Sequence, residues 1–87
     1  MNNKLYVGNL PYSVTSDELK NMFSQHGEVT DARVITYKDS GRSKGFGFVE
    51  FANETDAQTA ISSMNGQDVG GRKIIVNIAK PMENRNG

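Results

Sequence analysis

Cysteine is absent from the 87-residue chain, and histidine occurs only once, at His26. Without thiols the chain can form neither disulfides nor thiolate metal sites, and it has no cysteine nucleophile. With His26 as the only histidine, we expect neither an ordinary zinc site nor a Ser-His-Asp triad. We therefore expect a protein that carries no metal and no cofactor.

Long apolar runs and an excess of one charge sign are missing as well. No stretch approaches the ~20 apolar residues of a membrane-spanning helix, and Met1-Asn2-Asn3-Lys4 leads into an alternating pattern rather than a signal-peptide core. Lys plus Arg and Asp plus Glu both number 10, so the net charge does not indicate a nucleic-acid partner. We expect one small monomeric domain without a membrane partner, located in the cytoplasm, or in the nucleus if the source is a eukaryote.

What the sequence does contain is a regular succession of strand-like and helix-like segments. Alternation or β-branched residues predict strands over Lys4–Asn9, Val29–Thr36, Lys44–Ala52 and Lys73–Ala79. Thr15-Ser16-Asp17-Glu18 is a capping box that starts a helix ended by Gly27. Asn53 is the predicted cap of a second helix, which Asn65-Gly66 ends. Gly70-Gly71 is a predicted turn before the last strand.

The order βαββαβ predicts the fold class. It is an α+β, ferredoxin-like arrangement, with a four-stranded antiparallel sheet and two helices on one face, because each strand–helix–strand crossover is right-handed. We expect the domain to span residues 3–80 and residues 81–87 to form a short flexible C-terminal tail.

Strand parity divides the side chains between a helix-covered face and an open face. The residues predicted to meet the helices are Leu5, Val7, Ala32, Val34, Val49, Phe51, Ile74 and Val76. Tyr6, Phe46 and Phe48 then lie on the open face, where exposed aromatic rings indicate a binding surface. The opposite parity would expose Val49 and Phe51 instead, which is the less favourable arrangement.

Two of these strands resemble the signature of the RNA recognition motif family. Lys44-Gly45-Phe46-Gly47-Phe48-Val49-Glu50-Phe51 matches the family's octamer, and Leu5-Tyr6-Val7-Gly8-Asn9-Leu10 is similar to its companion hexamer. The resemblance covers about residues 3 to 80. It extends to small bacterial single-domain members as well as to single domains of eukaryotic splicing and heterogeneous nuclear proteins.

The resemblance implies a function and a set of contacts. Members bind single-stranded RNA without catalysis: the rings matching Tyr6 and Phe48 stack under bases, the ring matching Phe46 packs between sugars, and the residue matching Lys44 pairs with a phosphate. Gly45 and Gly47 add no side-chain volume on the helix-facing side of the strand, and Gly47 lets the helices come close to the sheet beneath the two rings. The predicted RNA-binding residues are Tyr6, Phe46, Phe48, Lys44, Lys4, Arg33, Arg42, Asn77, Ala79 and Lys80.

Charge placement agrees with this prediction. By parity and loop position, most basic residues lie on or around the open face, while the acidic residues of the helix side are opposed by Lys20 alone. Tyr12 and Tyr37 either extend the aromatic surface or cover neighbouring apolar atoms.

Other functions stay open at this point. Single-stranded DNA is an alternative ligand. The helices could hold a peptide, although protein-binding members often lack the aromatic residues that this chain retains. The same architecture also hosts small phosphatases, but no anion-cradling loop with an activating arginine and asparagine is present.

Overall fold

The computed structural model describes residues 3–79, and within them the predicted βαββαβ order is observed with one additional short hairpin before the last strand. The predicted tail at 81–87 and Lys80 lie outside the described residues. The elements are β1 (Lys4–Gly8), α1 (Ser16–Ser24), β2 (Val29–Thr36), β3 (Ser43–Phe51), α2 (Glu54–Met64), β4 (Asp68–Val69), β5 (Arg72–Lys73) and β6 (Ile75–Ile78).

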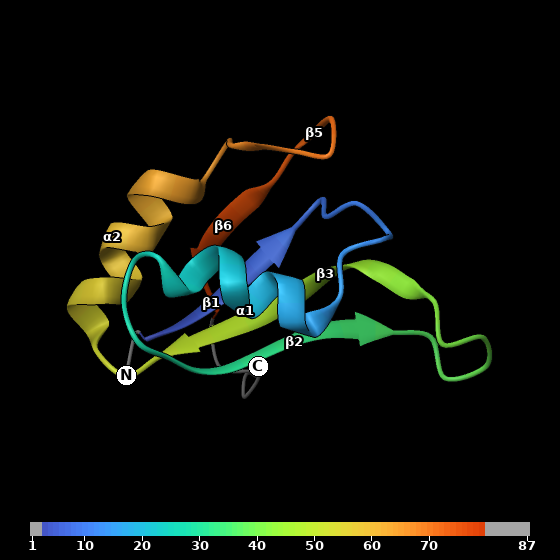
Figure 1. The fold of residues 1–87 in the computed structure, drawn as a ribbon, viewed down its shortest axis with the longest axis horizontal. Helices are drawn as coiled ribbons and strands as arrows, with labels where there is room; N and C mark the ends of the chain where they lie inside the picture. Colours follow the sequence, from blue (N-terminus) through green and yellow to red (C-terminus); the bar gives the residue numbers. More distant parts are fainter. Residues whose placement is uncertain (1–2, 80–87) are drawn as a thin grey trace, which may run out of the picture.

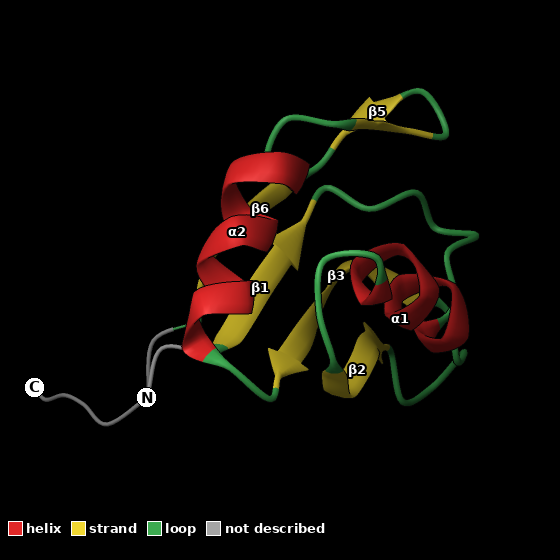
Figure 2. Ribbon diagram, turned by 60° about the vertical axis from the view of Figure 1, so that its left-hand side comes forward, coloured by secondary structure: helices red, strands yellow, loops and turns green. Residues whose placement is uncertain are grey.

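Four of the strands form one antiparallel sheet in the order β2-β3-β1-β6. Both helices lie over the same face of this sheet, with α1 against β2 and α2 against β6 (Figures 1 and 2). The predicted ferredoxin-like, two-layer α+β architecture is therefore confirmed, and within residues 3–79 no second layer covers the other face of the sheet.

The core occupies the space between the sheet and the helices. Phe51 and Phe23 meet there edge-on, with ring centroids 6.4 Å apart. Ala57 and Ala60 give α2 a small-residue face that lies close to the sheet. The predicted helix-facing residues are buried, except that Ala32 is half-buried against the same core. The parity assignment is thus confirmed.

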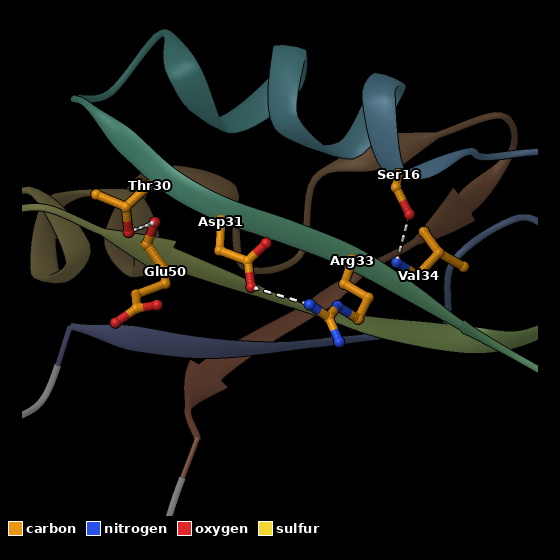
Figure 3. A network of polar contacts seen from close by, with 6 residues as sticks. All are labelled: Ser16, Thr30, Asp31, Arg33, Val34 and Glu50. Atoms are coloured by element: carbon orange, nitrogen blue, oxygen red, sulfur yellow. Dashed lines mark hydrogen bonds and ion pairs between the residues drawn. The ribbon is translucent and has the colours of Figure 1, made fainter.

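The start of α1 forms as predicted. The Glu18 amide donates to Thr15 Oγ1 at 3.2 Å, and the Thr15 amide donates to Glu18 Oε1 at 3.0 Å. This capping box satisfies two amide groups that the first turn of a helix leaves without partners. Ser16 adds a link to the sheet, because its Oγ accepts the Val34 amide at 2.9 Å (Figure 3).

The start of α2 differs from the prediction. The Asn53 side chain caps no backbone amide. Its Nδ2 donates instead to the Asp56 carboxylate at 3.2 Å, so the side chain acts as a donor where a cap needs an acceptor.

The predicted fourth strand, Lys73–Ala79, is shorter in the structure and begins at Ile75. Arg72 and Lys73 pair instead with Val69 and Asp68 in a separate hairpin. Gly70 and Gly71 connect its strands with φ of 58° and 86°, the left-handed values that a tight two-residue hairpin turn needs.

Among the described residues, neither helix combines the length and the apolar character that crossing a lipid bilayer requires.

Candidate nucleic-acid interface

Four of the predicted site residues form one row across the open face. In the strand register, Arg33 lies opposite Phe48, Phe48 opposite Tyr6, and Tyr6 opposite Asn77. Each residue of the row comes from a different strand of the sheet. Directly opposed side chains in a sheet are near neighbours, so the row is a continuous strip of side chains that crosses all four strands.

Three aromatic rings form a cluster on this face. The ring centroids of Tyr6 and Phe46 are 5.7 Å apart, those of Tyr6 and Phe48 are 6.0 Å apart, and those of Phe46 and Phe48 are 6.2 Å apart. All three side chains are partly exposed, although the strands beneath them are buried on the helix side. The cluster therefore offers flat apolar surfaces to a ligand, in an arrangement suited to stacking with planar groups.

A second row carries charges. Lys4 lies opposite Glu50, and Glu50 opposite Asp31. The Lys4 ammonium is 5.2 Å from the centroid of the Phe48 ring, a cation–π distance. Lys4 therefore joins the aromatic cluster to the charged row.

Arg33 is paired within the sheet. Its guanidinium lies 3.6 Å from the Asp31 carboxylate, with both side chains more than half exposed. Figure 3 shows Asp31, Arg33 and Glu50 on the side of the sheet opposite to α1. Exposed pairs of this kind contribute little to stability, so the pair does not fix the guanidinium in place.

The outer edge of the interface is formed by β6 and the residue after it. Asn77 is exposed, and its Oδ1 accepts the Ile78 amide at 2.9 Å. The Ala79 amide donates to the Lys4 carbonyl at 2.8 Å, which extends the pairing with β1 by one residue. Asn77 thus lies opposite Tyr6 of the aromatic cluster, and Ala79 lies beside Lys4.

Arg42 and Lys44 stand apart from this strip, at the loop end of the sheet. The Lys44 ammonium is 5.2 Å from the centroid of the Tyr37 ring, and both cations line a hollow with Tyr37. The predicted site residues that the structure describes therefore form two groups. Arg42 and Lys44 lie at the loop end, and the others lie on or beside the sheet: Tyr6, Phe46, Phe48, Lys4, Arg33, Asn77 and Ala79.

The role predicted for Gly47 is wrong in one respect. A Cβ at this position would meet the carbonyl oxygen of Arg33 and, at 3.0 Å, the Cα of Val34. Both atoms belong to the neighbouring strand β2, so the close approach that glycine permits is between strands and not between sheet and helix. Gly45 has a different constraint, a left-handed φ of 86° that favours glycine.

Gly8 has a role that the sequence did not reveal. A Cβ on Gly8 would lie 2.6 Å from Tyr6 Oη and 2.8 Å from Tyr6 Cε2. The Tyr6 ring therefore lies along its own strand, over a residue that has no side chain. A larger residue at position 8 would turn the ring out of its place.

We expect Gly8→Ala to weaken binding of single-stranded RNA by about 1 kcal/mol, the lower end of a base-stacking contribution. The fold should persist, because the clashing atoms belong to a partly exposed ring that can rotate. The measurement is a double-mutant cycle with Tyr6→Leu. Gly8→Ala should cost nothing further in the Tyr6→Leu background, and an equal cost in both backgrounds would show that Gly8 acts independently of Tyr6.

Comparisons with known proteins agree with this geometry. The family model described as RNA recognition motif matches residues 5–75. RNA-binding protein CP31B, chloroplastic, from Arabidopsis thaliana is 48% identical over 82 residues, which are 94% of this chain and 28% of the relative. The chain therefore spans less than a third of that relative's length.

Solved structures are similar over nearly the whole chain. The crystal structure of RNA Binding Protein PG1 has 47% sequence identity and a TM-score of 0.85, and the match covers 95% of this chain and 98% of that one. A structure of the Sxl-lethal protein/RNA complex has 34% identity and a TM-score of 0.91, and covers 95% of this chain and 50% of that one.

Proposed function

Because the chain belongs to the RNA recognition motif family, we propose that it is a non-catalytic module that binds single-stranded RNA on the open face of its sheet. The observation that carries the proposal is the cluster of partly exposed rings, Tyr6, Phe46 and Phe48, on the sheet face that neither described helix covers. The match to a protein/RNA complex with 34% identity supports it.

The ligand must be unpaired for this surface to work. Every base has an aromatic face, so flat rings bind bases with little sequence preference, each stacked base contributing about 1–3 kcal/mol. In a duplex the base faces are already stacked on one another and cannot reach the rings. Two to four unpaired nucleotides would fill the strip.

The charges surrounding the rings suit a polyanion. Lys4 and Arg33 are exposed beside the cluster, and Arg42 and Lys44 are exposed at its loop end. The helix side carries the opposite sign, with Asp17, Glu18 and Glu54 exposed in the first turns of α1 and α2. The four cations outnumber Asp31 and Glu50 on the same face, so a neutral chain presents a basic binding face.

The test compares single-stranded RNA with the same sequence held in a duplex. We expect roughly micromolar to hundred-micromolar affinity for the single strand and much weaker binding to the duplex, because a few stacked bases must offset the ordering of a flexible strand. Fluorescence anisotropy of a labelled heptamer measures both. Equal affinity for the two forms would indicate that phosphate charge alone drives binding and that the rings take no part. A DNA strand of the same sequence decides whether the 2′-hydroxyl matters.

Lys44→Ala should reduce the salt dependence of RNA binding. Loss of one phosphate contact lowers the slope of log affinity against log salt by about 0.7 for a single strand. Lys20→Ala is the matched control, since Lys20 is an exposed lysine on α1. An unchanged slope for Lys44→Ala, or the same change for both variants, would contradict the phosphate contact.

The cellular location and the oligomeric state of the chain are separate questions from RNA binding. The relative from Arabidopsis is named as a chloroplast protein, and that name describes the longer relative. For this chain, a cytoplasmic location and a monomeric state stay predictions, as does the likeness to small bacterial members. Fractionation of source cells, together with light scattering of the purified chain, tests the location and the oligomeric state.

A further inference from the structure

Two loops meet at one end of the sheet and enclose a hollow beside the aromatic cluster. The β1–α1 loop and the β2–β3 loop extend from the same end of the molecule (Figure 1). The hollow between them measures about 520 Å³ and is lined by Tyr12, Tyr37, Gly41, Arg42, Ser43 and Lys44. This volume is within the ~300–1,000 Å³ typical of sites for small organic groups.

The two tyrosines of the hollow do not serve the core. Tyr12 is 67% exposed and Tyr37 is 54% exposed, and neither packs in the core cluster. With Ile75, they are the large hydrophobic residues of the described chain that stand exposed. Two exposed rings that line one hollow form an apolar patch, and such a patch is typical of a binding surface.

The hollow is held in shape by its own contacts. In the β2–β3 loop, the Tyr37 amide donates to the Arg42 carbonyl and the Gly41 amide donates to the Tyr37 carbonyl, both at 2.8 Å. In the other loop, the Tyr12 ring lies over Gly45, where a Cβ would be 3.2 Å from Tyr12 Cε1. A site whose walls are already in place loses less entropy when it binds a ligand.

Each tyrosine ring also has a cation beside it. The Lys44 ammonium is 5.2 Å from the Tyr37 ring centroid, and the Arg72 guanidinium carbon is 5.4 Å from the Tyr12 ring centroid. The lining residues include two cations and no acid. Aromatic faces next to cations fit a nucleotide, with its planar base on a ring and its phosphate beside the charge.

The hollow is continuous with the sheet surface. A second, smaller hollow of about 240 Å³ shares Tyr12 and Lys44 with the first, and its lining reaches Tyr6 and Phe46 of the aromatic cluster. Tyr12 and Lys44 therefore stand between the aromatic cluster and the larger hollow, where a strand bound on the sheet would reach them first.

We propose that the hollow between Tyr12 and Tyr37 is a further nucleotide subsite, which takes an unpaired nucleotide of the RNA strand beyond those on the sheet. Its base lies against the tyrosine rings, and its phosphate lies near Arg42 and Lys44. This inference rests on the proposed function, since it extends the same strand from the sheet to the loops.

The test is the dependence of affinity on oligomer length. Wild type, the Tyr12→Leu/Tyr37→Leu variant and the Tyr12→Phe/Tyr37→Phe variant are each titrated with a uridine trimer and a uridine hexamer. We expect wild type to bind the hexamer about tenfold more tightly than the trimer, the equivalent of one added stacked base. The Leu variant should bind the trimer as tightly as wild type does. On the hexamer it should gain only the small increase in affinity that arises because a longer strand can bind in several positions. The Phe variant retains both rings and should keep the full gain.

Three outcomes would overturn the subsite. A Leu variant with the full length gain would show that the tyrosines do not contact RNA, and a Leu variant weakened equally on both oligomers would show that they support the sheet instead. Wild type that bound neither oligomer would overturn the proposed function as well. Thermal melting checks that the variants fold. If the double variant does not fold, Tyr37→Leu alone is used in its place, because it leaves the contact of Tyr12 with Gly45 intact.

Discussion

Phe51→Ala is expected to lower the free energy of unfolding by about 3–5 kcal/mol, the usual cost of removing a buried aromatic ring. The Phe51 side chain is fully buried and meets Phe23 edge-on between the sheet and the helices. For a small domain whose whole stability is about 5–15 kcal/mol, this is a large part of the total. Urea unfolding followed by circular dichroism measures the loss.

The control for this experiment lies on the same strand. Phe48→Ala removes an identical ring from the opposite face, where the side chain is partly exposed, so its melting should stay near that of wild type. If Phe48→Ala proved the more destabilising of the two, the assignment of the sheet faces would be reversed.

Phe48→Ala should weaken binding of single-stranded RNA by about 1–3 kcal/mol, equivalent to about five- to 150-fold in affinity. The substitution removes a stacking surface and leaves the basic residues in place. The slope of log affinity against log salt should therefore remain that of wild type, in contrast to Lys44→Ala. A salt titration of affinity measures both quantities on one set of samples.

Phe48→Tyr is the matched variant for binding, because it keeps an aromatic ring at this position. It should bind within a few-fold of wild type while Phe48→Ala does not. If Phe48→Ala folded and bound like wild type, the stacking role of this ring would be rejected.

The faces of the sheet could be predicted because the helices cover only one of them. Buried apolar residues and exposed residues therefore alternate along each strand. Val49 and Phe51 alternate with Phe48 and Glu50, and the structure buries the first pair and leaves the second pair partly exposed. The limits of β2, Val29–Thr36, were also predicted from its β-branched residues. In both cases the signal depends on residues that are adjacent in the chain.

The parts that could not be predicted depend on contacts between distant segments. Tyr12 and Arg72 come together only because the β1–α1 loop lies near the β4–β5 hairpin, and nothing local in the sequence marks that approach. The hairpin itself was recognised only as a turn at Gly70-Gly71, since two-residue strands are too short to show an alternating pattern. The contact of Gly47 with β2 likewise depends on strand pairing, which the sequence of one strand does not reveal.

Amide chemical-shift mapping with a single-stranded RNA oligomer is the most direct test of binding on the open face. We expect the largest shifts on β1 and β3, around Tyr6, Phe46 and Phe48, with the amides of α1 and α2 nearly unchanged. Shifts confined to residues 16–24 and 54–64 would contradict it, because they would place the ligand on the helices and leave the aromatic cluster without a role in binding.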